Sequence, residues 1–457
     1  MFLLWQANPR VHVSGPKESG IFPILLFLVS VPLTFAAAED PRDAEIRELK
    51  AMIRALEARV EALESQDRAP PSSAMPERLS GQVSEKRPME PTLSVTGEPE
   101  PLQPEEIRRS EEPDGIQFRG ALRYNVVATE GNLDAKRGES GLDVFRIGAE
   151  GSIDNFLVSA EYRFYSYMNT LKHGWIGYDF PDAGTLKIGV SQVPFGILPY
   201  ASHSWWFGIP YYVGLEDDYD LGIQYEAEGS GPWDYQVAFY KNEELGDATN
   251  LDRYSIDLVR VGDQQNEEVG QVNLRGTYTL GAGTDSIHEF GLSLQAGEML
   301  NNQTEDFGYH WAGGLHLDSR IRRWNFQLQL VRYEYHPENP PAVSDASVEM
   351  GAYAGSFAVA SEGTIGVANI AYNVPIEWPW LDSLLIYNNF SVLDKDESAF
   401  NESVLNTTGA AFGKGPLFLY LDLIQTKNML YFEEGSLAGE GNDSWDTRLN
   451  FNIGYYW

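Results

Sequence analysis

LNFNIGYYW, residues Leu449 to Trp457, alternates apolar with polar or small side chains and ends on a tryptophan. Successive side chains of an extended strand point to opposite faces, so this stretch has one apolar and one polar face. The apolar face carries Leu449, Phe451, Ile453, Tyr455 and Trp457, and the opposite face carries Arg448, Asn450 and Asn452. An apolar face that ends in aromatic residues is typical of membrane β-barrels, in which it meets lipid. We therefore interpret this stretch as the closing strand of a barrel, which leaves no soluble tail.

The same period of two recurs throughout residues 114–457, in segments bounded by Gly, Asp, Asn or Pro. Apolar and polar side chains would also alternate along the strands of a soluble β protein. Here, however, the apolar faces repeatedly end in Tyr, Trp or Phe, and the opposite faces mix Arg, Glu, Asn and Gln, as lipid-facing and water-facing sides require. We count about seventeen candidate strands and expect about 16, because bacterial barrels close with even numbers. The weakest segments are Gly351–Ala360 and Asn401–Phe412. The predicted fold is all-β, a transmembrane antiparallel β-barrel.

The composition excludes several classes of protein. A formal net charge of −34 argues against a nucleic-acid partner, because phosphates would be repelled. The 24 Tyr, 22 Phe and 11 Trp argue against disorder. The absence of Cys excludes disulfides and thiolate metal sites. No nucleophile-elbow, zinc-protease or phosphate-binding motif occurs, so we expect no enzyme, no cofactor and no bound metal.

Residues 1–38 have the features of a secretory signal peptide. Arg10 and Lys17 precede an apolar run, Ile21–Phe35, and the small residues Ala36, Ala37 and Ala38 follow it. The alternative is a membrane anchor, which the short run and its two prolines disfavour. With the barrel, the signal peptide predicts the outer membrane of a Gram-negative bacterium.

Two further segments separate the signal peptide from the barrel. Residues 39–66 carry a heptad pattern that predicts a coiled-coil oligomerisation helix. Its core positions are Ile46, Leu49, Ile53, Leu56, Val60 and Leu63. β-branched residues at a with Leu at d favour dimers in model peptides, and the alternative is an amphipathic helix that packs on its own barrel or on the cell wall. Residues 67–113 contain nine prolines and predict an extended linker, so both segments would lie in the periplasm.

A long aromatic connection, Pro194–Asp220, is the most informative loop. A loop of this length is unusual unless it is functional. One interpretation is a constriction loop folded into the barrel; the other is an outer loop that packs on the rim or on a neighbouring subunit. The candidate residues of the constriction are Trp205, Trp206, Tyr211, Tyr212, Glu216, Asp217 and Asp218. The acidic run with Asp220 would suit Ca²⁺, but no glycine stands where an EF-hand-like loop needs one, so a solvated acidic turn is the favoured interpretation.

Basic residues with the parity of the inner face form a second candidate set. They are Arg119, Arg123, Arg146, Arg163, Lys187, Arg275 and Arg448. Such a set would attract anions into a pore. Residues 114–457, however, hold 48 Asp and Glu against 20 Lys and Arg. We therefore favour pairing with Glu150, Glu161 and Glu226 across the lumen, with little net anion preference.

Leu186–Gly196, with the aromatic loop and Asp218–Tyr225 after it, resembles the phosphate-selective porin O and P family. The order of signal peptide, coiled coil, linker and barrel is similar too. The resemblance implies a sixteen-stranded homotrimeric porin with inward-folded loops. The aromatic C-terminal strand is in addition what the barrel-assembly machinery is expected to recognise when it places a barrel in lipid. Phosphate-selective members line their pores with many Arg and Lys, whereas lysines are scarce here.

A barrel of about 16 strands encloses an aqueous channel rather than a packed interior. We therefore expect passive diffusion of small hydrophilic solutes or ions. The alternative in the same class is a phosphate- or anion-selective porin. From other classes, the chain would be a structural barrel that tethers the outer membrane to the cell wall, or an outer-membrane hydrolase.

Overall fold

The structure is a computed structural model that describes residues 115–129, 139–181, 183–228, 231–430, 435–439, 441 and 444–457. The predicted signal peptide, coiled coil (Ile46 to Leu63) and linker lie outside the described residues, so they stay predictions. No helix of the described part of the chain is both long and apolar enough to span a membrane.

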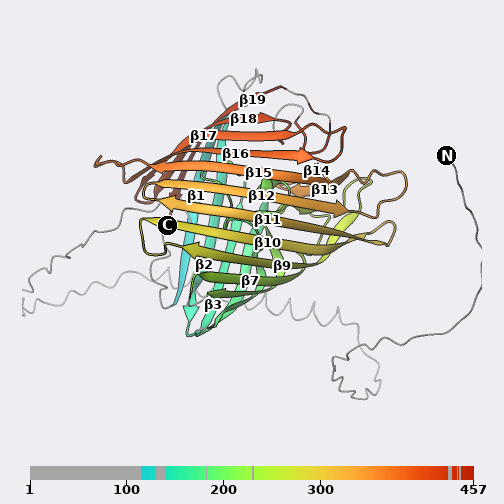
Figure 1. The fold of residues 1–457 in the computed structure, drawn as a ribbon, viewed down its shortest axis with the longest axis horizontal. Coiled ribbons are helices and arrows are strands. Elements are labelled where there is room, and N and C mark those ends of the chain that lie inside the picture. The colour runs from blue at the N-terminus through green and yellow to red at the C-terminus, as the bar shows by residue number, and fades with distance from the viewer. Residues whose placement is uncertain are drawn as a thin grey trace, which may run out of the picture. The chain divides into compact units, whose positions relative to one another are not determined.

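Sixteen strands close into one antiparallel barrel, in which each strand pairs with its two neighbours (Figure 1). In chain order they are β1 (Gly115–Thr129), β2 (Glu139–Ile153), β3 (Phe156–Phe164), β4 (Asn169–Phe180), β5 (Gly184–Gln192), β6 (Tyr219–Glu228), β7 (Trp233–Glu243), β9 (Asn266–Leu280), β10 (Ser286–Asn301), β11 (Phe307–Ile321), β12 (Trp324–His336), β15 (Glu362–Asn373), β16 (Ser383–Lys395), β17 (Ser403–Lys414), β18 (Leu417–Lys427) and β19 (Asp446–Tyr456). The predicted all-β barrel and its strand number are confirmed.

The C-terminal stretch closes this barrel, because β19 pairs with β1 from Ala121↔Tyr456 to Thr129↔Arg448. The backbone amides of Gly120 and Trp457 each donate to the other's carbonyl, at 3.0 and 3.1 Å. The faces follow the alternation: Leu449, Tyr455 and Trp457 are exposed on the outside, and Asn450 and Asn452 are buried. The closing strand predicted from the sequence is confirmed.

Three strands lie outside the barrel wall and form a small sheet in the order β14-β13-β8. They are β8 (Asp257–Leu258), β13 (Ser347–Ala352) and β14 (Gly355–Ala360). Two segments had the weakest strand pattern in the sequence. Asn401–Phe412 overlaps the barrel strand β17, and Gly351–Ala360 belongs to the small sheet. Tyr353 and Ala354 turn the chain between β13 and β14 with positive φ angles of 53° and 62°.

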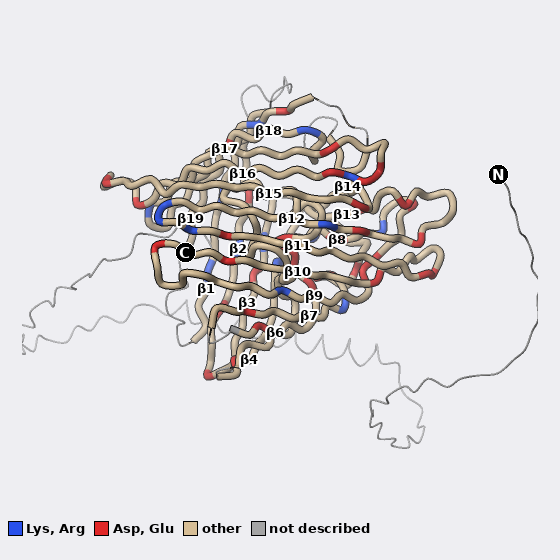
Figure 2. Tube along the Cα trace, viewed as in Figure 1, with Lys and Arg blue, Asp and Glu red and all other residues tan. Residues whose placement is uncertain are grey.

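The two ends of the barrel differ in their connections. Short turns join β2 to β3, β11 to β12 and β17 to β18 at one end. Long connections, 193–218, 244–265 and 337–361, leave the other end, and Figure 2 shows acidic residues gathered where β8, β13 and β14 lie. Long loops on one side and short turns on the other are the usual asymmetry of outer-membrane barrels.

Strand β12 shows how both faces change toward the long-loop end. Its outward residues Leu328 and Leu330 are exposed and apolar, but Arg332 and Glu334 follow them on the same face. Arg332 pairs with Glu334 at 2.8 Å and with Asp396, the residue after β16, at 2.6 Å. The inward face changes the opposite way, from Asn325, Gln327 and Gln329 to Val331, Tyr333 and Tyr335. The charged outer residues mark where the strand leaves an apolar surround.

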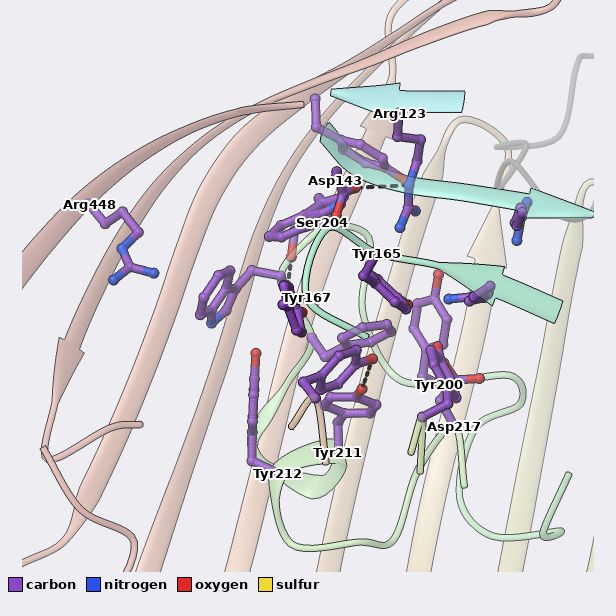
Figure 3. Close-up of a pocket in the computed structure, with 18 of the residues that line it drawn as sticks. Arg123, Asp143, Tyr165, Tyr167, Tyr200, Ser204, Tyr211, Tyr212, Asp217 and Arg448 are labelled. Atoms are coloured by element: carbon purple, nitrogen blue, oxygen red, sulfur yellow. Dashed lines mark hydrogen bonds and ion pairs between the residues drawn. The ribbon is translucent and has the colours of Figure 1, made fainter. Parts of the chain in front are cut away.

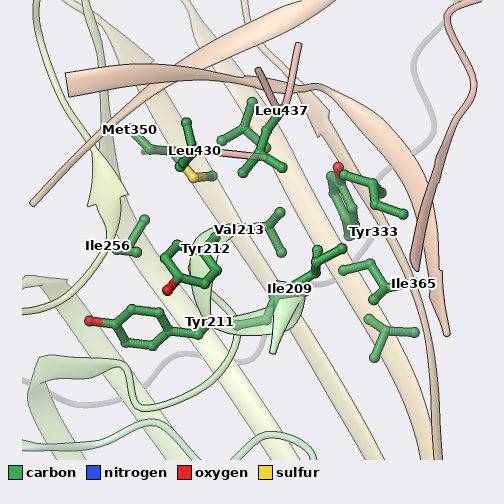
Figure 4. Packing of buried hydrophobic residues seen from close by; sticks show 14 of the residues in the cluster. Ile209, Tyr211, Tyr212, Val213, Ile256, Tyr333, Met350, Ile365, Leu430 and Leu437 are labelled. Atoms are coloured by element: carbon green, nitrogen blue, oxygen red, sulfur yellow. The ribbon is translucent and has the colours of Figure 1, made fainter. Parts of the chain in front are cut away.

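The apolar inward residues of the wall belong to a hydrophobic core inside the long-loop half of the barrel (Figure 4). Val331, Tyr333, Ile365 and Leu393 contribute from the wall strands. Ile209, Tyr211, Tyr212 and Val213 of the connection between β5 and β6, and Leu258, Val348, Met350 and Val359 of the small sheet, pack against them. The sequence predicts a water-facing inner side for every strand. In this half of the barrel that prediction is wrong, because the connection between β5 and β6 and the small sheet cover the inner side of the wall.

Candidate functional site

The connection between β5 and β6, residues 193–218, which we call the β5–β6 loop, lies inside the barrel. It contains the short helix α2 (Ile209–Tyr212). The backbone amide of Ile197 donates to Gln329 of β12 at 3.0 Å, and that of Ile209 donates to Ser391 of β16 at 3.1 Å. Strands β12 and β16 are separated from β5 and β6 by several strands in either direction around the wall. The loop therefore crosses the interior, as the constriction-loop interpretation expects and the rim interpretation does not.

Two buried polar side chains of the β5–β6 loop bind the far wall. His203 Nε2 donates to Asn325, and His203 Nδ1 lies 2.9 Å from the Asn389 amide. Burial lowers the pKa of His203, which keeps the ring neutral. The Glu216 carboxyl accepts from Gln329 Nε2 at 2.6 Å and from the Ala201 amide at 3.2 Å. Burial raises the pKa of Glu216 to about 7.

A cavity of about 620 Å³ remains between the β5–β6 loop and the opposite wall (Figure 3). Its lining comes from strands β1, β2, β3, β18 and β19, from the β5–β6 loop, and from the connections 165–168, 244–265 and the turn at 353. The charged lining residues are Arg123, Asp143, Arg146, Arg163, Asp217 and Arg448. The aromatic lining residues are Tyr165, Tyr167, Tyr200, Trp205, Trp206, Phe207, Tyr211, Tyr212, Tyr254, Tyr353, Tyr420 and Tyr456.

Four of the seven predicted basic residues converge on this cavity. Arg123 pairs with Asp143 at 2.9 Å. Arg146 and Arg163 share one carboxylate, Glu161, at 3.2 and 2.6 Å. The guanidinium of Arg448 lies 5.2 Å from the centre of the Trp206 ring, within the range of a cation–π contact. Four arginines and two aspartates line the cavity, so basic side chains outnumber acidic ones in its lining although the barrel as a whole is acidic.

The other three basic residues do not line the cavity. Arg119 pairs with Glu150, and Lys187 pairs with Glu226 at 2.7 Å. Arg275 donates to the Gly196 carbonyl at 2.8 Å and thereby holds the start of the β5–β6 loop.

The carboxylates predicted as partners are therefore the right ones, but their position across the lumen is wrong. Glu150, Glu161 and Glu226 lie on strands adjacent to those of Arg119, Arg146 and Lys187, and Arg163 lies on the same strand as Glu161. The antiparallel register brings residues of neighbouring strands side by side on one face. These ion pairs therefore run along the wall and do not span the lumen.

The four aromatic candidates of the β5–β6 loop all reach the cavity. Trp205 and Trp206 are tilted against each other with ring centres 5.5 Å apart. Phe207 stacks on Tyr211 at 4.1 Å. The hydroxyl groups of Tyr211 and Tyr353 lie 2.6 Å apart, which ties the loop to the turn between β13 and β14.

The acidic run is buried, so the prediction of a solvated turn is wrong. Glu216, Asp217 and Asp218 are at most 4% exposed. Asp217 accepts from the hydroxyl of Tyr219 at 2.9 Å and faces Lys172 at 3.6 Å. The acidic residues fold inward with the β5–β6 loop, where Asp217 contacts these protein groups and not solvent.

Sequence reasoning missed most of the tyrosines that complete the cavity. Tyr165, Tyr167, Tyr254 and Tyr353 come from three other connections. Their aromatic character was a signal, but only the tertiary structure tells which connections fold inward. Asp143 has the parity of Ile147, an outward residue of β2, and lies at a register shift opposite Arg123 and Tyr124, so alternation alone could not have found it.

No protein-family model and no curated protein matches the chain. Among solved structures, the outer-membrane channel DcaP of Acinetobacter baumannii is similar at 11% identity and a TM-score of 0.51, covering 75% of this chain and 97% of that one. An anion-selective porin from Comamonas acidovorans has the same identity and TM-score, over 75% and 99% of the two chains. OmpT, an outer-membrane protein of Vibrio cholerae, is 14% identical with a TM-score of 0.50, over 76% and 100%. The chain shares the fold of these outer-membrane proteins; at such identities the likeness concerns the fold alone.

Proposed function

We propose that this protein is an outer-membrane porin through which small hydrophilic solutes diffuse passively. The observation that carries the proposal is the β5–β6 loop inside a closed sixteen-stranded barrel, which leaves a polar and aromatic cavity of about 620 Å³ beside it. The interior of a barrel this wide is not filled by wall side chains, so a segment folded into it sets the width available to solutes.

The outer surface supports placement in a lipid bilayer. Exposed apolar side chains cover the middle of the wall, for example Ile188, Ile223, Val272, Leu294, Leu315 and Leu330. Exposed aromatic residues such as Trp233, Trp324 and Trp457 lie at the short-turn end, as an interfacial girdle requires. By analogy with outer-membrane barrels, the short turns would face the periplasm and the long loops the outside.

The cavity favours the second candidate in the same class, a porin with a preference for anions. Four arginines (Arg123, Arg146, Arg163 and Arg448) line it against two aspartates (Asp143 and Asp217), so basic side chains outnumber acidic ones in the lining. The tyrosine and tryptophan rings on the other side offer flat surfaces to an apolar or sugar-like solute body. We therefore propose a modest preference for small organic anions. A phosphate-specific pore would need more lysine and arginine than these residues supply.

Several further properties of the protein are proposed from its sequence. They are membership of the porin O and P family, a homotrimer, assembly by the barrel-assembly machinery, the absence of enzymatic activity and a periplasmic N-terminal segment. The structural tether depends on residues 39–113, which lie outside the described residues. It remains the alternative from another class.

Planar-bilayer recording tests the channel directly. Purified full-length protein in a KCl gradient should give stepwise conductance and a reversal potential of anionic sign, while heat-unfolded protein at the same concentration should give neither. Addition of phosphate should reduce the current no more than other small anions do. Folded protein that inserts without conductance steps would refute the channel and leave the tether as the better account.

A further inference from the structure

Five buried carboxyl groups meet where the β5–β6 loop joins β6 and packs against the 244–265 connection. They are Asp218, Asp220, Glu243, Glu244 and Asp257. Asp218, Asp220 and Asp257 each place one carboxylate oxygen within 4.8 Å of the other two. Oxygens bound to one Ca²⁺ at about 2.4 Å lie no more than about 4.8 Å apart. The three oxygens therefore have the spacing of ligands to a single ion.

The hydrogen bonds of these groups leave oxygens without donors. Asp218 Oδ1, Asp220 Oδ1 and Glu244 Oε2 are buried and accept no hydrogen bond from an N–H or hydroxyl group of the described residues. The Asp257 carboxyl lies within hydrogen-bonding reach of the Asp218 and Glu244 carboxyls, a contact that needs a shared proton. The other oxygen of Glu244 accepts from the backbone amides of Tyr254 and Ser255, both at 3.2 Å, which fixes the carboxyl group in place. A buried carboxylate oxygen without a donor is unfavourable, and a cation in contact with it removes that penalty.

The charges of the cluster do not balance among the described residues. Ion pairs join it to one basic side chain, Arg253, which lies 3.2 Å from Glu243 and 3.4 Å from Asp257. Five carboxyl groups, together with Glu268 of β9 close to Asp218 and Asp220, thus face one guanidinium. Burial raises the pKa of Asp218, Glu244 and Asp257, because it disfavours their charged forms.

We propose that Asp218, Asp220 and Asp257, together with Glu244, form a site for a hard divalent cation, and we assign Ca²⁺. All the donors are oxygens, and the chain has no cysteine, which disfavours soft transition metals. Several carboxylates on loops suit the larger and more flexible coordination shell of Ca²⁺ better than the strict octahedron of Mg²⁺. The ion would join the end of the β5–β6 loop and the start of β6 to β8, and so hold the loop inside the barrel.

This site differs from the acidic turn read from the sequence. Glu216 binds Gln329 and the Ala201 amide, and Asp217 binds Tyr219 and Lys172, so neither is available as a ligand. The essential contribution of Asp257 comes from another connection, 37 residues after Asp220 in the numbering. Only the folded chain brings these groups together.

Calorimetric titration of CaCl₂ into chelator-treated full-length protein in detergent tests the site. We expect saturable binding of one Ca²⁺ per chain, tighter at higher pH because protons leave the carboxyl groups. Asp257→Asn should weaken the affinity at least about tenfold, since it removes one charged ligand. Asp252→Asn, an exposed neighbour on the same connection, is the matched control and should bind as the unmodified protein does.

Absence of saturable binding, or equal affinity in Asp257→Asn and Asp252→Asn, would overturn the assignment. If Asp257→Asn fails to give a folded barrel, Glu244→Gln takes its place with the same expectations. The proposal does not depend on transport. Protein that conducts but binds no Ca²⁺ would refute this site alone, and protein that binds Ca²⁺ without conducting would refute the channel alone.

Discussion

The guanidinium of Arg448, on the closing strand β19, lies 5.2 Å from the centre of the Trp206 ring in the β5–β6 loop. The contact joins two sets of residues that the sequence presents separately, the basic inner-face residues and the aromatic loop. It places a positive charge and an indole next to each other in the lining of the cavity.

Replacing this arginine should change the ion preference of the channel. Arg448→Gln removes one positive charge and keeps a polar side chain. We expect the anion-over-cation permeability ratio from the reversal potential to fall about twofold, because one charge a few ångströms away shifts the potential by about kT. Arg332→Gln, on the outward face of β12, is the control and should leave the reversal potential unchanged. Equal shifts in the two variants would show that the cavity charge does not matter.

The hydrophobic core should hold the β5–β6 loop in place. Ile209 is fully buried in it, whereas Ile223 is exposed on the outer face of β6. Ile209→Ala should weaken loop docking by about 2–4 kcal/mol through lost contacts and a cavity. Chymotrypsin would then cleave within residues 193–218 faster, as mass spectrometry of the fragments measures. Ile223→Ala makes the same chemical change outside the core, and comparable cleavage of both variants would contradict the role of the core.

Docking of the loop should also depend on pH through Glu216. Its pKa is raised from 4.5 to about 7 by burial, so the docked loop holds the proton more tightly than an undocked one. The stabilisation is therefore complete below pH 4.5 and is lost as the pH rises through about 7. We expect the loss to be at most about 3 kcal/mol.

Hydrogen exchange of residues 193–218, compared between the unmodified protein and Glu216→Gln at each pH, isolates this effect. The ratio of their exchange rates cancels the intrinsic pH dependence and the contribution of His203, which both proteins share. The exchange rate of the unmodified protein divided by that of Glu216→Gln should rise between pH 5 and pH 8. A ratio that stays flat over this range would mean that Glu216 does not control docking.

The sequence predicted the wall of this barrel well, because each strand reports its own two faces through the alternation of side chains. Leu449 to Trp457 shows this most clearly, with Asn450 and Asn452 inside and Leu449 and Tyr455 outside. The ion pairs of Arg119, Arg146 and Lys187 were also predictable as residue types. Their position was not, because adjacent-strand partners follow from the register, which a single strand does not reveal.

The interior was harder to predict, because it depends on contacts between distant connections. Val331 and Tyr333 face inward, yet they pack in a core whose other half comes from the loop and the small sheet. Gly351–Ala360 looked like a weak barrel strand because its pattern has a strand period, and its pairing with β8 and β13 lies outside any local signal. Likewise, the sequence predicted a solvated acidic run, because nothing local shows that Asp218 meets Asp257.

Blocking the channel from a residue of the β5–β6 loop tests the central claim most directly. The chain has no native cysteine, so Trp205→Cys introduces a unique thiol that lines the cavity. In planar bilayers, a cationic methanethiosulfonate reagent should lower the conductance of each open channel in steps, and a reducing agent should restore it. Leu330→Cys, on the outer face, should conduct unchanged after the same treatment. Full conductance in Trp205→Cys channels shown to be labelled would contradict a loop that lies in the path of the solute.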